Sequence, residues 1–106
     1  MNDMDKEILD KATVKGSYLM YKERPLVREN NVICYGNMAD EYVLCLTIMS
    51  EKEENGKTVP DMVLIQIVNT DPSLSATDKI AKQDIKKGLY DAFEIGYIWL
   101  TRLIGE

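Results

Sequence analysis

Apolar and polar residues alternate with a period of two between Pro25 and Asn69, which is the pattern of β-strands. Asn30-Asn31 and Asn55-Gly56 interrupt this pattern, and Asn and Gly tolerate the positive φ angles that tight hairpin turns require. The sequence therefore predicts a four-stranded antiparallel meander, with strands over 26–28, 32–35, 41–50 and 61–69.

Helical spacing follows this region. Ser75 and Asp78 resemble a helix-capping box, which predicts a helical segment over 76–87 that ends at Gly88. From Leu89 to Leu103 apolar residues form a wide stripe at helical spacing. This last segment is predicted to be a helix packed on one face of the sheet.

The N-terminal region carries a thinner stripe. Met4, Ile8 and Ala12 recur every four residues, which predicts a short helix over 3–15, followed by an extended lead over 17–21. We expect one α+β domain over 1–106, with residues 1–17 forming a loosely attached helical N-terminus. Its parts are a four-stranded antiparallel β-meander, a C-terminal helix on one face, and short N-terminal and pre-C-terminal helical segments.

Strands 41–50 and 61–69 carry apolar side chains on both faces. A strand with one face in water would alternate more strictly, so both are expected to be central strands covered on each side. The C-terminal helix supplies one cover, and either the N-terminal segment or another copy of the chain supplies the other. In the first of these strands, one face holds Tyr42, Leu44, Leu46 and Ile48, and the other holds Val43, Cys45 and Met49.

Composition restricts the possible chemistry. The 106 residues include no histidine, and 18 acidic side chains outnumber 13 basic ones, for a net charge of −5. Without imidazole the chain has no Ser-His-Asp or Cys-His relay and no His-rich metal site. The negative charge disfavours nucleic acid, because phosphates are bound by many Lys and Arg. We expect no catalytic residue, no metal site, no cofactor and no nucleic acid partner.

The sequence also favours a cytoplasmic location. Its N-terminus is acidic and lacks the cationic start and apolar stretch of a signal peptide. The longest apolar run, Ile95–Leu100, is far shorter than the roughly 18 residues that span a bilayer, so no membrane partner is expected. Two cysteines match neither a disulfide framework nor zinc-site spacing, which indicates reduced thiols.

Cys34 and Cys45 become cross-strand neighbours if residues 37–42 close a hairpin. Such a pair could act as a redox switch. The alternative is two small buried hydrophobic side chains, because free cysteine is among the most buried residue types.

A cationic surface is a second candidate site. Lys22, Arg24 and Arg28 share one strand face, so an anionic ligand could bind if these groups converge. Solvated charged side chains are the alternative explanation. The residues predicted to bind such a ligand are Arg24, Arg28, Tyr21 and Tyr35.

The aromatic residues suggest a sheltered surface. Six tyrosines against one phenylalanine is an unusual choice for a dry core, because each hydroxyl needs a partner or water. Tyr and Trp are also enriched at protein interfaces. The residues predicted to form an interface are Tyr42, Leu44, Tyr97 and Trp99.

Several short strings together resemble a family of small proteins of unknown function from Gram-positive, Clostridia-like bacteria. The resemblance covers about residues 18 to 103 and implies a cytoplasmic bacterial protein, without supplying an activity. The strings that carry it are Tyr21-Lys22-Glu23-Arg24-Pro25-Leu26-Val27-Arg28, Tyr35-Gly36, Thr70-Asp71-Pro72, Gly88-Leu89-Tyr90 and Ile95-Gly96-Tyr97-Ile98-Trp99-Leu100.

The leading functional hypothesis is a small non-enzymatic interaction or assembly module. Its partner is a second copy of the chain, forming a homodimer, or another protein, and the contact covers the second apolar sheet face or an edge strand. The alternative is a protein that binds a small molecule or an anionic ligand through Arg24, Arg28 and nearby tyrosines.

Overall fold

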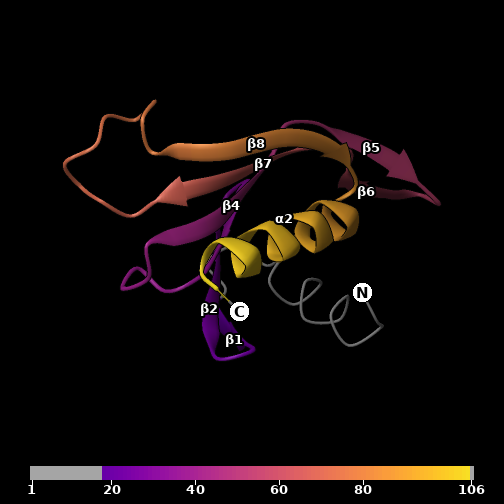
Figure 1. Ribbon diagram of the computed structural model, residues 1–106. Coiled ribbons are helices and arrows are strands. Elements are labelled where there is room, and N and C mark those ends of the chain that lie inside the picture. Colours follow the sequence, from indigo (N-terminus) through magenta and orange to yellow (C-terminus); the bar gives the residue numbers. More distant parts are fainter. Residues whose placement is uncertain (1–17, 106) are drawn as a thin grey trace.

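A six-stranded antiparallel sheet with one helix packed across it forms the fold in the computed structural model, which describes residues 18–105 (Figure 1). The strand order is β1-β2-β3-β4-β7-β8, so every strand pairs with its neighbour along the chain except where one hairpin interrupts β4 and β7. The six strands are β1 (Tyr18–Tyr21), β2 (Arg24–Glu29), β3 (Val32–Tyr35), β4 (Tyr42–Ile48), β7 (Met62–Asn69) and β8 (Ile80–Lys87), and the helix is α2 (Leu89–Leu103).

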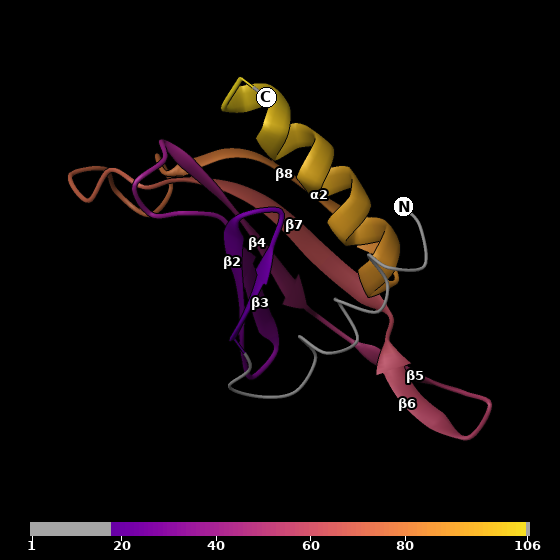
Figure 2. The same ribbon diagram turned by 90° about the horizontal axis from the view of Figure 1, so that it is seen from below.

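The interrupting hairpin consists of β5 (Glu51–Glu54) and β6 (Lys57–Pro60). β4 and β7 pair in one continuous register beside this hairpin. The hairpin itself projects beyond the sheet, as Figure 2 shows. Asn55 and Gly56 form its tip with φ angles of 52° and 79°, the backbone of a type I′ turn. The predicted Asn-Gly hairpin is therefore confirmed.

The β2–β3 hairpin is confirmed as well, with Asn30 at a φ of 54° in its turn. The extended lead predicted before it is a full edge strand, β1, which pairs with β2. Lys22 and Glu23 form that turn at φ angles of 49° and 68°, which residues other than Gly and Asn seldom adopt. Since neither residue signals a turn, the β1–β2 hairpin was not predicted.

The helical segment predicted over 76–87 is wrong. Only one turn exists there, where the backbone N–H of Asp78 donates to Ser75 Oγ at 3.1 Å. The chain then forms β8, which pairs with β7 along its length and contains a bulge opposite Ile67 and Val68. Pairing with the free edge of β7 overrides the local helical pattern. The four-stranded meander is therefore corrected to a six-stranded sheet with a separate two-stranded hairpin.

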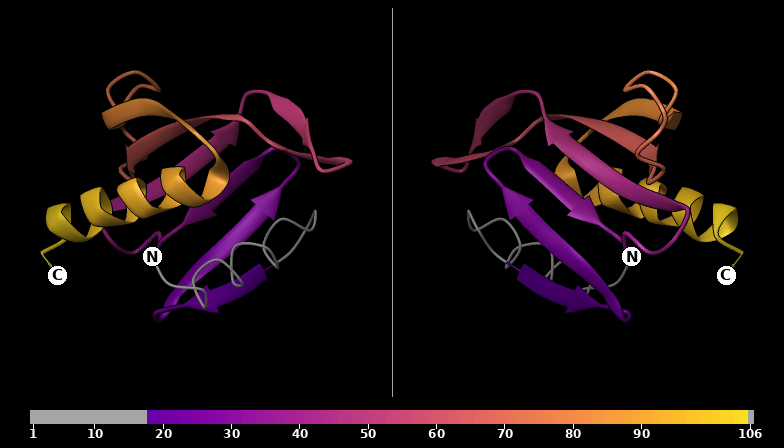
Figure 3. Two further views of the ribbon diagram at one scale, coloured as in Figure 1. Left: turned by 90° about the vertical axis from the view of Figure 1, so that its right-hand side faces the viewer. Right: turned by 90° about the vertical axis from the view of Figure 1, so that its left-hand side faces the viewer.

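The helix α2 covers one face of the sheet over β4, β7 and β8, as the two views of Figure 3 show. Gly96 lies at the closest approach, where a Cβ atom would meet the side chains of Leu44 and Ile65. An aromatic cluster of Tyr21, Tyr35 and Phe93 extends this core, with ring centroids 5.4 to 5.9 Å apart. The buried helix residues are Leu89, Ala92, Phe93, Gly96 and Leu100.

One sequence prediction differs from the structure at the end of α2, and another concerns residues that the structure does not describe. Leu103, assigned to the buried stripe, is 45% exposed because it lies at the end of α2. The helix predicted over 3–15 and the N-terminal cover lie outside the described residues.

Candidate functional site

The side of the sheet that faces away from α2 is the candidate site, and we term it the open face. Leu26, Ile33, Leu44 and Ile65 are buried on the helix side, so their chain neighbours point the other way. Within residues 18–105 no helix lies over the open face. Its residues are Pro25, Val27 and Glu29 from β2, Val32 and Cys34 from β3, Val43, Cys45 and Thr47 from β4, Met62, Leu64, Gln66 and Val68 from β7, and Gln83, Ile85 and Lys87 from β8.

The open face is uncharged through its centre, where aliphatic side chains and thiols lie beside the polar Thr47, Gln66 and Gln83. Its two charged residues, Glu29 and Lys87, each end their strand at the periphery. A hollow of about 510 Å³ lies over β2, β3 and β4, and Met38 at its rim is 70% exposed. The lining residues are Pro25, Val27, Cys34, Tyr35, Gly36, Asn37, Met38, Val43, Cys45 and Val68. Apart from the exposed Met38 and the buried Tyr35 and Val43, the apolar side chains of the hollow are half-buried. Contiguous apolar surface that solvent reaches marks interaction sites.

Cys34 and Cys45 lie directly opposite each other in β3 and β4, which confirms the predicted cross-strand neighbours. Their Sγ atoms are 2.6 Å apart, and both side chains are half-buried free thiols. Either sulfur can donate the hydrogen bond between them, and this bond lowers the pKa of Cys34 and raises the pKa of Cys45. Burial raises the pKa of Cys45 further.

Of the four residues predicted to bind an anion, Arg24, Tyr21 and Tyr35 lie close together and Arg28 lies apart from them. Tyr35 donates from its hydroxyl to the backbone carbonyl of Tyr21 at 2.8 Å, and the two side chains are 1% and 7% exposed, so both belong to the core. Burial raises the pKa of Tyr35, and the nearby Arg24 partly offsets this. Arg24 lies 3.9 Å from the carboxylate of Asp40, in a hollow of about 280 Å³.

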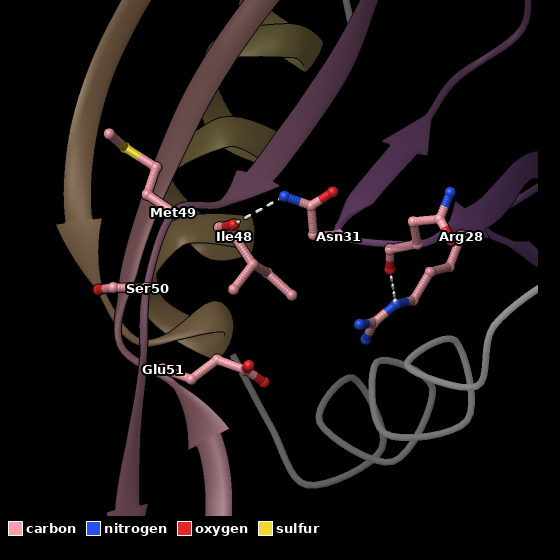
Figure 4. A pocket seen from close by; sticks show the side chains of 7 residues that line it. Arg28, Asn31, Ile48, Met49, Ser50 and Glu51 are labelled. Carbon is pink, nitrogen blue, oxygen red and sulfur yellow. Dashed lines mark hydrogen bonds between the residues drawn. The ribbon is translucent and has the colours of Figure 1, made fainter.

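Arg28 lies at the other end of β2, in a separate hollow of about 320 Å³ (Figure 4). Its Nε donates to the backbone carbonyl of Asn30 at 2.7 Å. The carboxylate of Glu51 lines the same hollow and would repel an anion. The side-chain amide of Asn31 donates to the backbone carbonyl of Ile48 at 3.0 Å. This hydrogen bond joins the start of β3 to the end of β4, where both residues line the hollow.

The predicted interface residues lie on the helix side of the sheet. Leu44 is fully buried beneath Gly96, so its assignment to an interface is wrong. Tyr42 packs against the core, and Tyr97 lies 6.1 Å from both Tyr21 and Phe93, measured between ring centroids. The ammonium nitrogen of Lys82 lies over the ring of Trp99, 4.4 Å from the ring centroid.

Sequence reasoning missed several residues of the candidate surface, among them Val27, Ile85 and Met38. A signal for this face was present in the second apolar set of strands 41–50 and 61–69, which includes Val43, Cys45 and Val68. Which of the two sets faces α2 depends on three-dimensional packing, so the pattern alone did not identify the open one.

Comparisons with models of known protein families, with curated proteins and with solved structures found no match to this chain. The resemblance to a Clostridia-like family stays a prediction. In the described range, α2 is too short and too polar to cross a membrane. No three Cys, Asp or Glu side chains of residues 18–105 are grouped so that they could hold a metal ion.

Proposed function

We propose that this protein is a non-enzymatic assembly module, in which the open face binds the open face of a second copy to form a homodimer. The observation that carries the proposal is an apolar, centrally uncharged sheet face with no helix over it among the described residues. Burying apolar surface stabilises association by about 25 cal/mol per Å². The cost of the translational and rotational freedom that the two copies lose must be subtracted from this gain.

Charge favours a second copy over a charged partner. Each copy has a net charge of −5, so two copies repel unless their contact surface keeps charges apart. The open face meets this condition, because Glu29 and Lys87 lie at strand ends and the centre holds amides, thiols and aliphatic groups. A two-fold axis through the sheet would bring identical uncharged rows together. A partner recognised by charge would find few groups to pair with here.

The size of the open face is close to that of a small stable interface. Five strands about 4.8 Å apart, with three rows of side chains about 7 Å apart, give a flat area of roughly 500 Å². Two such faces bury roughly 1,000 Å² in total, which lies at the low end of specific interfaces. Sheets packed face to face in this way lie about 10 Å apart.

The proposal needs no cofactor and no catalytic group. We place the module in the cytoplasm, where free thiols such as those of Cys34 and Cys45 stay reduced. Arg24 and Arg28 face separate hollows, and each hollow also holds a carboxylate, of Asp40 or Glu51, which disfavours the anionic-ligand alternative.

Two isoleucines provide a matched test. Ile85 on the open face and Ile98 on the outer side of α2 are both 41% exposed, and replacing either by glutamate changes the net charge equally. Ile85→Glu is expected to weaken dimerisation at least about tenfold, because each copy would bury a carboxylate without a partner in an apolar contact. Ile98→Glu is expected to leave it unchanged. Light scattering after size-exclusion chromatography measures both.

Circular dichroism and thermal melting show whether each variant keeps its fold, which we expect since exposed substitutions usually change stability by less than about 0.5 kcal/mol. If Ile98→Glu dissociates the dimer and Ile85→Glu does not, the interface lies on the helix side and the proposal is wrong. A wild-type monomer would also contradict it and would favour residues 1–17 as the cover of the open face.

A further inference from the structure

The backbone around Cys34 and Cys45 has the geometry that a cross-strand disulfide requires. Ile48 donates its backbone N–H to the carbonyl of Asn31 at 2.8 Å, so residues 31 and 48 form a hydrogen-bonded pair of the β3–β4 ladder. Such pairs alternate with non-hydrogen-bonded ones, which places Cys34 and Cys45 in a non-hydrogen-bonded pair. Their Cα atoms are then about 4.5 Å apart, inside the range of about 4.4 to 6.8 Å that disulfides span.

The two thiols are chemically unequal. Cys34 lines both the open-face hollow and a second hollow of about 380 Å³, whereas Cys45 lines only the first of these two. Either sulfur can donate in the hydrogen bond between them, which lowers the pKa of Cys34 and raises the pKa of Cys45. The thiolate is the nucleophile in exchange reactions, and both the wider access and the lowered pKa favour Cys34 in that role. Cys45 lies 2.6 Å away, where it can attack a disulfide formed on Cys34.

Both thiols line the open-face hollow, whose walls limit what can reach them. Val27, Val43, Val68 and Met38 line the same hollow as the pair, and among residues 18–105 no basic side chain lines it. A disulfide with carboxylate groups would find no cation there and would approach a chain of net charge −5. Small uncharged disulfides meet neither obstacle.

We propose that Cys34 and Cys45 form a thiol–disulfide exchange site for small uncharged aliphatic disulfides. The Cys34 thiolate attacks one sulfur of the small disulfide, which forms a mixed disulfide and releases the other half as a thiolate. Cys45 then loses its proton to that thiolate or to water and attacks Cys34 Sγ, which forms the Cys34–Cys45 bond and releases the second half. The protein loses two electrons and two protons, and the small disulfide is reduced to two thiols.

The test uses the full chain, reduced and then treated with 2-hydroxyethyl disulfide at neutral pH. Intact mass is expected to show the loss of two hydrogen atoms, and peptide mapping is expected to join Cys34 to Cys45 within one chain. Oxidised glutathione, a charged disulfide, is expected to react several-fold more slowly. A chain that keeps both thiols, or that links to another chain instead, overturns the proposal.

Single variants test the order of attack. Cys45→Ser keeps a hydrogen-bond donor beside Cys34 and is expected to stop at one stable mixed disulfide. Cys34→Ser leaves only Cys45, whose pKa is still raised by burial and which lines only one of the two hollows, and it is expected to react several-fold more slowly than Cys45→Ser. Equal rates for the two variants would overturn the assignment of Cys34 as the nucleophile.

Exchange does not require the dimer, although a dimer through the open face would shield the hollow. The reaction is therefore measured on both wild type and Ile85→Glu. Absence of exchange in both overturns this proposal and leaves the dimer proposal untouched, whereas exchange in a wild-type monomer supports this one and contradicts the dimer.

Discussion

Phe93→Ala is expected to lower the free energy of unfolding by about 3 to 5 kcal/mol, the range for removing a buried phenylalanine ring. Phe93 is 2% exposed, and its ring centroid lies 5.4 Å from that of Tyr35 and 5.9 Å from that of Tyr21. Both contacts have edge-to-face geometry, which adds to the burial. Because small domains are stable by only about 5 to 15 kcal/mol, this is a large fraction of the total. Urea denaturation followed by tyrosine and tryptophan fluorescence measures it.

Leu103→Ala is the control for this loss. Leu103 lies on the same helix but is 45% exposed, so its removal is expected to change stability by less than about 0.5 kcal/mol. Equal losses in the two variants would show that α2 does not pack on the sheet through Phe93.

Gly96→Ala is expected to destabilise the protein by about 1 to 3 kcal/mol through overpacking. In an exposed helix the same change stabilises by about 1 kcal/mol, because alanine is the better helix former. At Gly96 the added Cβ would meet the side chain of Leu44, with Cδ2 at 2.9 Å, and Ile65 Cγ2 at 3.2 Å. Leu44 is fully buried, so it cannot move aside without disturbing the core.

A double variant separates this clash from other effects of the substitution. In a Leu44→Ala background the space is already free, so Gly96→Ala is expected to cost less there than in wild type, and thermal or urea unfolding of the four proteins measures the difference. If Gly96→Ala raised the stability of the wild-type chain, α2 would lie farther from the sheet than the structure places it.

The turns and pairings that depend on local chemistry were predicted correctly. Asn30 and the Asn55-Gly56 pair adopt positive φ angles at hairpin tips, as their side chains favour. The short connection between β3 and β4 fixed their register, so the pairing of Cys34 with Cys45 could be predicted without knowledge of the core.

Features that depend on distant parts of the chain were not predicted. Residues 80–87 contain lysines at helical spacing, and only the unpaired edge of β7 makes this segment a strand. Leu44 was assigned to an interface because β4 is apolar on both faces, and the choice between them is made by α2. Lys82 shows the same dependence, because β8 places its ammonium over the ring of Trp99.

The open face connects the proposed assembly with the proposed chemistry. The dimer would bury the rows of side chains on β2, β3, β4, β7 and β8, and the exchange site lies among them. In a dimer the thiols would be shielded from solvent, so exchange would proceed through the dissociated monomer. Dissociation would then set how fast small disulfides react with Cys34.

Sedimentation equilibrium of the reduced wild-type chain, from low micromolar to hundreds of micromolar concentrations, tests the assembly most directly. We expect a reversible monomer–dimer equilibrium whose midpoint moves to higher concentration in Ile85→Glu and stays in place in Ile98→Glu. A single monomeric species with a mass of 12.1 kDa across the whole range would contradict it.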